Sequence, residues 1–244
     1  MKIIDNDLKL LKEKYPDNLD EILKKVEEGY PIQYLIGYVD FYGYKINVDN
    51  SVLIPRFETE YLIEKTINYL KKYNFNNNMQ IIDLATGSGC IAITLKHKYP
   101  LSTIKAIDIS SKALNKCQEN MKLNDVELHL EQKDILKDKF SGKYDLIISN
   151  PPYVNKNQIV DIQTKYEPQN AIFADNEGLE FYEKIAQISK NIANKKSIIA
   201  LEIGYEQASK IREIFKQLFP DAIIKVEQDY QNFDRYVFIF NNCE

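Results

Sequence analysis

Seven consecutive residues, Ile148 to Val154, combine residue types that suit the binding of a planar group. They read Ile-Ser-Asn-Pro-Pro-Tyr-Val and close a mostly apolar run, Tyr144 to Ile148. The two prolines fix successive φ angles and remove two backbone donors, and the first one disfavours helical geometry at Asn150. We therefore expect a strand to end at Asn150 and to present its side-chain amide at the strand's carboxyl end.

This turn offers hydrogen-bond acceptors beside a flat ring. The side-chain oxygen of Asn150 and the neighbouring carbonyl groups accept from an NH2 group, and Tyr153 supplies an aromatic face. Such a site suits a carboxamide or the amino edge of an adenine. The same tetrapeptide is also explained by a strand that simply ends at two prolines and has no chemical function. The rest of the chain must distinguish the two interpretations.

A glycine-rich turn between an apolar strand and a helix is the second candidate site. Residues 81–92 read Ile-Ile-Asp-Leu-Ala-Thr-Gly-Ser-Gly-Cys-Ile-Ala. Gly87 and Gly89 let the backbone approach a ligand, and the helix start offers free N–H groups. The next acidic strand end, Asp108, follows 25 residues after Asp83, which is close to the spacing of a ribose-binding carboxylate in a doubly wound fold.

Two cofactors fit this turn. Residues 87–92 satisfy the relaxed dinucleotide pattern GxGxxA, which indicates NAD. Asp83 argues against NAD, because a carboxylate at the end of the first strand would repel a pyrophosphate. The same carboxylate would stabilise the cationic ammonium or sulfonium group of S-adenosylmethionine, which also has a ribose. The turn therefore favours S-adenosylmethionine.

The end of the third strand of this unit adds a candidate for adenine binding. Asp134 can accept a hydrogen bond from the adenine amino group, and Ile135 can cover one face of the ring. A helix cap is the alternative function of this aspartate.

The overall composition excludes several other classes. A net charge of -4 and a pI near 5.5 argue against broad nucleic-acid binding, which needs a basic surface. Three widely spaced cysteines and two histidines indicate neither a disulfide framework nor a protein metal site, so we expect a reducing compartment. Residues 1–5 lack the apolar core of a signal peptide, and no long apolar run exists. We expect a cytoplasmic protein with no membrane attachment.

These motifs require a doubly wound α/β sheet to position them, because strands and helices alternate from Met79 onward. The expected strands are Gln80–Leu84, Thr103–Asp108, Glu127–Leu130, Tyr144–Ser149, Ser197–Ile203, Ala222–Glu227 and Tyr236–Phe240. The expected helices are Cys90–His97, Lys112–Leu123, Leu179–Ala193 and Glu206–Leu218. The last two strands have no helix between them, so we expect them to form an antiparallel hairpin at one edge of a mostly parallel sheet.

The preceding residues predict a smaller region. Apolar spacing indicates helices over residues 4–14 and 18–28, residues 34–54 indicate a β-hairpin, and a further helix is expected over Tyr61–Lys72. The asparagine-rich stretch 74–78 has the composition of a linker. We therefore expect an N-terminal substrate-docking region over residues 1–74 and a cofactor-binding catalytic domain over residues 75–244.

The order of these motifs resembles that of class I S-adenosylmethionine-dependent N-methyltransferases. Residues 55–60, Pro-Arg-Phe-Glu-Thr-Glu, are similar to the PRPxTE signature of the release factor glutamine methyltransferase family. Further blocks similar to that family are Tyr34–Gly37, Phe41–Gly43, Tyr166–Pro168, Leu201–Gly204 and Asp229–Tyr230. The resemblance covers roughly residues 29–240.

The resemblance implies methyl transfer from S-adenosylmethionine to the side-chain amide nitrogen of the glutamine in the Gly-Gly-Gln tripeptide of peptide-chain release factors. The residues that it implies for cofactor binding, together with those argued above, are Asp83, Ala85, Thr86, Gly87, Ser88, Gly89, Asp108, Asp134, Ile135 and Asn150. The residues expected to hold the glutamine are Asn150, Pro151, Pro152, Tyr153, Arg56 and Glu58, and Asn150, Pro151 and Tyr153 are the expected catalytic residues.

Three features depart from the family pattern. Ala85 stands where the family usually has Gly, and its effect depends on whether φ is positive there. Phe57 replaces the usual Pro. The family normally has a larger N-terminal helical bundle than the 28 residues that precede Gly29 here.

The expected mechanism is catalysis by positioning, since no strong base is evident in a site motif. The side-chain oxygen of Asn150 and the carbonyl of Pro151 would each accept one N–H of the substrate, and Tyr153 would pack on the flat amide. The alternative enzyme class methylates the N6 amine of adenine in DNA or RNA, which this tetrapeptide serves equally. A non-catalytic cofactor-binding protein is the third class.

Overall fold

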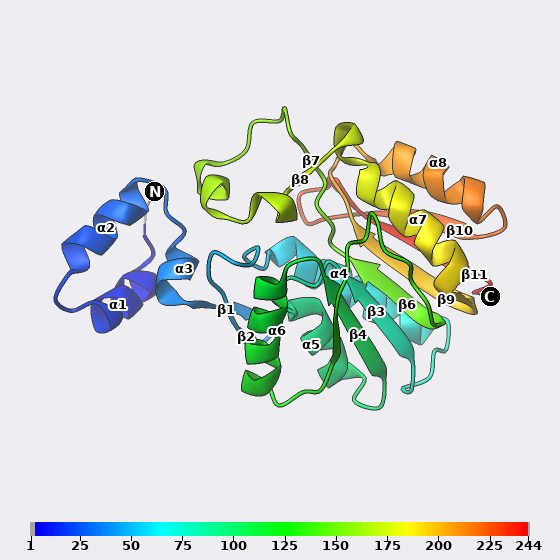
Figure 1. Ribbon diagram of the computed structural model, residues 1–244, viewed down its shortest axis with the longest axis horizontal. Coiled ribbons are helices and arrows are strands. Elements are labelled where there is room, and N and C mark those ends of the chain that lie inside the picture. The colour runs from blue at the N-terminus through cyan, green and yellow to red at the C-terminus, as the bar shows by residue number, and fades with distance from the viewer. Residues whose placement is uncertain (1–2, 244) are drawn as a thin grey trace.

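The computed structural model describes residues 3–243, and a seven-stranded sheet forms its centre (Figure 1). Residues 1–5, which lack the apolar core of a signal peptide, therefore lie partly outside the described residues. The strands lie in the order β10-β11-β9-β6-β3-β4-β5. Their bounds are β3 Gln80–Leu84, β4 Thr103–Asp108, β5 His129–Gln132, β6 Tyr144–Ser149, β9 Ala193–Glu202, β10 Ile223–Gln228 and β11 Asp234–Asn241.

Helices cover both faces of this sheet, and the alternation of side chains along the strands explains why. The helices are α4 Phe57–Lys72, α5 Cys90–Lys98, α6 Ser111–Leu123, α7 Glu180–Ile192 and α8 Ala208–Leu218. Ile81 and Leu146 point into the core beneath α4, α5 and α6, whereas Ile82 and Ile147 point into the core beneath α7 and α8. Strands whose two faces are both buried need apolar residues at nearly every position.

The doubly wound α/β class and the terminal hairpin are confirmed. Strands β5, β4, β3, β6 and β9 are parallel, while β11 pairs antiparallel with both β9 and β10. The predicted bounds of β3, β4 and β6 match the structure. Other bounds were wrong by a few residues: β5 begins later than predicted, β9 begins earlier, and α4 begins at Phe57 rather than at Tyr61.

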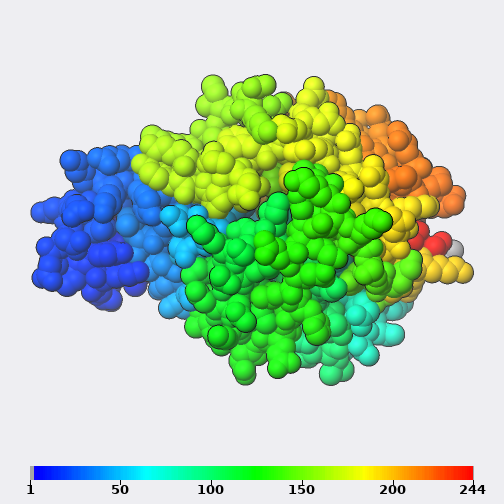
Figure 2. Space-filling model, in the orientation of Figure 1, coloured from blue at the N-terminus to red at the C-terminus, as the bar shows by residue number. Residues whose placement is uncertain are grey.

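The N-terminal helices α1 (Asp5–Lys14) and α2 (Leu19–Glu27) are also confirmed. The predicted hairpin is narrower than expected and consists of β1 (Tyr38–Phe41) and β2 (Tyr44–Asn47). A short helix α3 (Ile32–Ile36) precedes it, and Gly37 caps the end of this helix with a φ angle of 92°. The first three helices share a small core of their own and lie to one side of the sheet, where they appear blue in Figures 1 and 2.

The segment between β6 and α7 was not predicted to have structure. It contains the two-residue strands β7 (Val154–Asn155) and β8 (Phe173–Ala174), which pair in parallel, and short 3-10 helices at Ile162–Tyr166, Gln169–Ala171 and Asn176–Gly178. Figure 2 shows this yellow-green segment between the blue N-terminal helices and the yellow α7 region. It covers the edge of the sheet at which the candidate site residues lie.

The parallel register brings the predicted site residues to this edge. Leu84 of β3 lies opposite Ile107 of β4 and opposite Ser149 of β6. The hydroxyl of Ser149 donates to the carbonyl of Leu84 at 2.6 Å, which ties two strand ends together. The next residues along the three strands are therefore neighbours, and they are Ala85, Asp108 and Asn150.

Within residues 3–243, no helix has the length and the apolar character that crossing a membrane requires.

Candidate active site

The glycine turn after β3 has the left-handed backbone that its sequence suggests. Ala85, Gly87 and Gly89 have φ angles of 60°, 55° and 83°. A Cβ atom on Gly89 would lie 2.4 Å from the sulfur of Cys117 on α6, so only glycine fits there. Ala85 is an L-residue in a conformation that normally favours glycine, which makes it a point of backbone strain.

Asp83 lies beneath this turn and is fully buried. One carboxylate oxygen accepts a hydrogen bond from the hydroxyl of Thr86 at 2.6 Å, and the other has no partner within the described residues. Burial raises the pKa of Asp83 to about 7, and the nearby Asp108 carboxylate adds to this effect. An unpaired buried carboxylate oxygen is an acceptor that a cationic ligand would stabilise.

Asp108, at the end of β4, holds the turn and faces a cavity. Its two carboxylate oxygens accept from the backbone N–H groups of Gly87 and Ser110, each at 2.9 Å. Burial raises its pKa, and these two hydrogen bonds oppose the rise. A carboxylate has about four acceptor positions, so two remain for a ribose diol.

A cavity of about 320 Å³ opens in front of these groups. Of the predicted cofactor residues, those that line it are Ala85, Gly87, Asp108, Asp134, Ile135 and Asn150. The other four, Asp83, Thr86, Ser88 and Gly89, shape the turn behind it. Lining residues that were not predicted include Leu53, Ser110, Phe173 and Phe181.

The position of Asp134 is compatible with both functions that its sequence left open. It lines the cavity, and one carboxylate oxygen accepts from the backbone N–H of Leu136 at 2.9 Å, as in a turn cap. The other oxygen pairs with Lys137 at 3.2 Å. Ile135 is buried beside it and contributes an apolar wall. The cavity thus offers acidic groups at two strand ends with an apolar surface between them, which fits an adenosine carrying a cationic substituent.

A second cavity of about 240 Å³ adjoins the first. Leu53, Asn150 and Ala171 line both cavities. The predicted substrate residues Arg56, Pro151 and Tyr153 line the second one, whereas Pro152 lines the first. Asn150 therefore stands where the two cavities meet.

Tyr153 is held at this boundary by its backbone. Its carbonyl accepts from the side-chain amide of Gln207 at 2.9 Å. A Cβ on Gly178 would lie 2.1 Å from the same oxygen, so glycine is required there for close approach. Burial raises the pKa of the Tyr153 hydroxyl, so this side chain stays neutral near pH 7.

Arg56 and Glu58 have different positions in the structure. One guanidinium nitrogen of Arg56 donates to both carboxylate oxygens of Glu167, at 2.9 and 2.6 Å. Glu167 is buried, and this contact joins the start of α4 to the segment that covers the site. The side chain of Glu58 lines neither cavity, and its backbone carbonyl accepts from the hydroxyl of Tyr236 at 2.7 Å.

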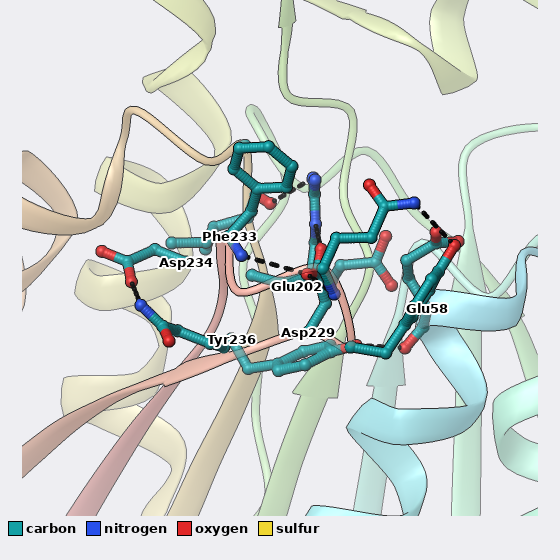
Figure 3. Close-up of polar contacts among 12 residues, drawn as sticks. Glu58, Glu202, Asp229, Phe233, Asp234 and Tyr236 are labelled. Atoms are coloured by element: carbon teal, nitrogen blue, oxygen red, sulfur yellow. Dashed lines mark hydrogen bonds and ion pairs between the residues drawn. The ribbon is translucent and has the colours of Figure 1, made fainter.

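A polar cluster surrounds this end of α4. Figure 3 shows Glu202, Asp229 and Tyr236 gathered next to Glu58, and Asp229 accepts the hydrogen bonds that shape the loop between β10 and β11. Arg235 donates to Asp229 at 3.2 Å and to the carbonyl of Ile203 at 3.1 Å. The loop is thereby fixed against the end of β9.

Thr59 contacts Asn150 directly and Glu202 is linked to it through Thr59, and neither residue was assigned a function from the sequence. The side-chain nitrogen of Asn150 donates to the hydroxyl oxygen of Thr59 at 3.1 Å, and the Thr59 hydroxyl donates to Glu202 at 2.7 Å. Thr59, Glu202 and the Glu167 described above all lie in blocks that matched the family by sequence. Those matches were the available signal, but sequence spacing alone gave no reason to bring them together.

Three comparisons agree with this architecture. The family model for the methyltransferase small domain matches residues 64–168. A solved methyltransferase from Pyrococcus furiosus superposes with a TM-score of 0.61 at 15% identity, covering 93% of this chain and 98% of that one. A ribosomal protein L11 methylase from Lactobacillus delbrueckii subsp. bulgaricus gives 0.55 at 21% identity, covering 80% and 83%. At these identities the structures show the shared fold alone.

Fold, glycine turn and strand-end acids together define a Rossmann-like class I methyltransferase. Among curated proteins, the release factor glutamine methyltransferase of Lactococcus lactis is 38% identical over 97% of this chain and 84% of its own length. That of Streptococcus pneumoniae is 36% identical over 91% and 78%. The chain belongs to the release factor glutamine methyltransferase family.

The positive φ of Ala85 predicts that Ala85→Gly stabilises the protein. Glycine removes the left-handed strain of about 1 kcal/mol, and its greater freedom in the unfolded chain offsets part of this gain. We expect Tm to rise by about 1–3 °C, measured by calorimetry. The control is Ala113→Gly at the start of α6, where φ is helical and the change should lower Tm. A lower Tm for Ala85→Gly would contradict the strain.

The raised pKa of Asp83 predicts that the free energy of unfolding depends on pH. Its ordinary value is 3.8 and its folded value is about 7, so between these pH values the folded state binds more protons than the unfolded one. The free energy of unfolding therefore falls as pH rises through this window, by at most about 1.4 kcal/mol per pH unit, and levels off above it.

Asp83→Asn removes this titration. Urea unfolding at pH 5, 6, 7 and 8 should show the wild type losing stability relative to Asp83→Asn up to about pH 7. The same change at the exposed Asp221 controls for the loss of one carboxylate. A difference between wild type and Asp83→Asn that stays constant with pH would contradict the burial argument.

Proposed function

We propose that this protein transfers the methyl group of S-adenosylmethionine to the side-chain amide nitrogen of the glutamine in the Gly-Gly-Gln tripeptide of a peptide-chain release factor. Membership of the family supports the reaction. The observation that carries it is the position of Asn150 between an adenosine-sized cavity and a second, smaller cavity. A donor in one cavity and an amide in the other would meet at this residue.

The first cavity fits the cofactor. Asp108 would bind the ribose, Asp134 the adenine amino group, and Ile135 the face of the ring, while the Ala85–Gly89 turn would surround the methionine part. The buried Asp83 would stabilise the positive charge of the cofactor. S-adenosylmethionine supplies an activated methyl group on a sulfonium.

The residues of the second cavity would position the glutamine. An amide nitrogen is a poor nucleophile, because its lone pair is delocalised into the carbonyl. The side-chain oxygen of Asn150 and the carbonyl of Pro151 would each accept one of its N–H groups, which orients the lone pair and stabilises positive charge that develops on nitrogen. Tyr153 would pack on the flat amide, and Pro152 would fix the turn.

Proton removal needs no strong base in this scheme. None of the described residues that line the two cavities is a histidine, and Tyr153 keeps its proton. Once nitrogen has a fourth substituent its proton becomes acidic, and it leaves to water.

Binding of the release factor would involve the N-terminal part of the chain. We assign substrate docking to residues 1–74 and catalysis to residues 75–244. Arg56 would support the wall of the glutamine site through Glu167, and Glu58 would act through its helix turn rather than by contact. The acidic net charge favours a protein over a nucleic acid as the substrate. A function in translation termination supports a cytoplasmic location.

The direct test is mass spectrometry of a release factor after incubation with the enzyme and cofactor. One added methyl on the tripeptide glutamine is expected. A release factor with Gln replaced by Glu controls for the site of modification. Labelled methyl appearing in DNA or RNA, with none in the release factor, would instead establish the adenine alternative.

Replacing Asn150 tests the acceptor function. Asn150→Ala removes one of two acceptors aimed at the reacting nitrogen, so we expect kcat to fall by about 10²–10³-fold. The Kd for S-adenosylmethionine, measured by calorimetry, should change much less. Asn191→Ala at the end of α7 is the matched control with normal turnover. Normal turnover by Asn150→Ala would refute this mechanism.

A further inference from the structure

The orientation of the Asn150 amide decides what its site can bind. The oxygen and nitrogen ends of a carboxamide have nearly the same shape but opposite hydrogen-bonding character. If the oxygen faces the second cavity, the site accepts from an NH2 group; if the nitrogen faces it, the site donates and repels the same group. The tetrapeptide itself does not select between these two orientations, so another contact must do so.

A buried chain of hydrogen bonds from two other elements makes this selection. Glu202 is the last residue of β9 and Thr59 lies in the first turn of α4, and both are about 2% exposed or less. The Thr59 hydroxyl donates its single proton to Glu202 at 2.7 Å. Its oxygen can then only accept, and it accepts from the side-chain nitrogen of Asn150 at 3.1 Å.

The carboxylate of Glu202 determines which groups donate and which accept in this chain of hydrogen bonds. An ionised carboxylate accepts and does not donate, so Glu202 requires the Thr59 hydroxyl to point toward it. Burial raises the pKa of Glu202 to about 7, whereas the hydrogen bond from Thr59 and the nearby Arg235 and Arg56 favour the ionised form. When Glu202 is ionised, its charge sets the direction of the hydrogen-bond chain, which reaches Asn150 through the Thr59 hydroxyl.

The positions of the three residues are fixed by the fold. Ser149, just before Asn150, lies opposite Leu201, just before Glu202, in the parallel pairing of β6 and β9. The hydroxyl of Tyr182 on α7 donates to the backbone carbonyl of Glu202 at 2.9 Å. The start of α4 is held by the contact between Tyr236 and the carbonyl of Glu58, seen in Figure 3.

We propose that Thr59 and Glu202 are positioning residues that hold the Asn150 amide with its oxygen toward the second cavity, and that they thereby restrict the substrate to groups that donate from an NH2. The inference rests on the proposed function for its consequence, but the hydrogen-bond chain exists without a substrate. Neither Thr59 nor Glu202 lines the first cavity, whereas Glu202 lines the second one. We therefore expect both residues to affect the orientation of the Asn150 amide and not the binding of the cofactor.

Thr59→Val is the first test, because valine keeps the shape of threonine and removes the hydroxyl. Without the acceptor, the amide populates both orientations. We expect kcat for release factor to fall roughly three- to tenfold, the value of one neutral hydrogen bond. The Kd for S-adenosylmethionine should be unchanged by calorimetry. Thr59→Ser keeps the hydroxyl and should restore kcat, although it loses a buried methyl group.

Thr66→Val is the matched control. Thr66 lies on the same helix and is equally buried, but its hydroxyl donates to the backbone carbonyl of Leu62 at 2.6 Å. This variant should keep wild-type kcat. If Thr66→Val lowers kcat as much as Thr59→Val, the effect is a general loss of packing in α4 and the proposal fails.

Glu202→Gln tests the other end of the chain with almost no change in shape. The amide of glutamine can donate to Thr59 as well as accept from it, so the direction is no longer fixed, and we expect a several-fold loss of kcat. Because Glu202 also lines the second cavity, a lower kcat in this variant is not enough by itself. If Thr59→Val does not fold, the solvent exchange of the Asn150 NH2 group in Glu202→Gln decides the question. Wild-type kcat in Glu202→Gln, together with wild-type kcat in any folded Thr59→Val, would overturn the proposal.

A measurement without turnover separates this proposal from the proposed function. The side-chain NH2 signals of Asn150, identified by their loss in Asn150→Asp, should exchange slowly with solvent in the wild type and faster in Thr59→Val by NMR. Equal exchange rates of the Asn150 NH2 protons in the two proteins would refute the proposed chain of hydrogen bonds. A wild type that transfers no methyl to release factor would refute the proposed function, while the NMR result would still decide the orientation.

Discussion

The parallel register of β3, β4 and β6 is the constraint on which the site depends. Leu84, Ile107 and Ser149 lie level across the sheet, so three chain segments leave the strands at the same height. The hydroxyl of Ser149 fixes this level by binding the carbonyl of Leu84. A slip of one residue in β6 would turn Asn150 to the opposite face of the sheet. The glycine turn, Asp108 and Asn150 form one site only in this register.

Several residues of the site lower the stability of the folded protein, and the packing of the central sheet compensates for them. Asp83 and Glu202 are both buried carboxyl groups whose pKa values are raised to about 7, and Ala85 has a left-handed backbone. Groups of this kind destabilise the folded state when they have no ligand. They sit at the ends of strands whose apolar side chains are buried on both faces, and this packing keeps them in place.

Local signals explain why much of the fold and the cofactor side of the site could be predicted. Continuous apolar runs marked β3 and β6, and glycines and prolines marked where they end. The segment between β6 and α7 was missed, because its two-residue strands and short 3-10 helices have no periodicity to detect. The partners of Asn150 were missed for another reason: Thr59 and Glu202 lie 91 residues before and 52 residues after it, and only tertiary packing brings them together.

The second cavity, in which we propose that the substrate glutamine binds, is formed by several separate segments of the chain. Its walls come from the Asn150–Tyr153 turn, from the start of α4 and from the segment between β6 and α7. The buried Glu167 joins two of these walls by its ion pair with Arg56. Removing Arg56 would leave the buried charge of Glu167 without compensation, which costs more than an exposed pair contributes. The second cavity thus combines the carboxyl ends of β6 and β9, through Asn150 and Glu202, with segments outside the sheet. Because one fold supports many functions through its site residues, changes in these outer segments can alter the substrate without altering the central sheet.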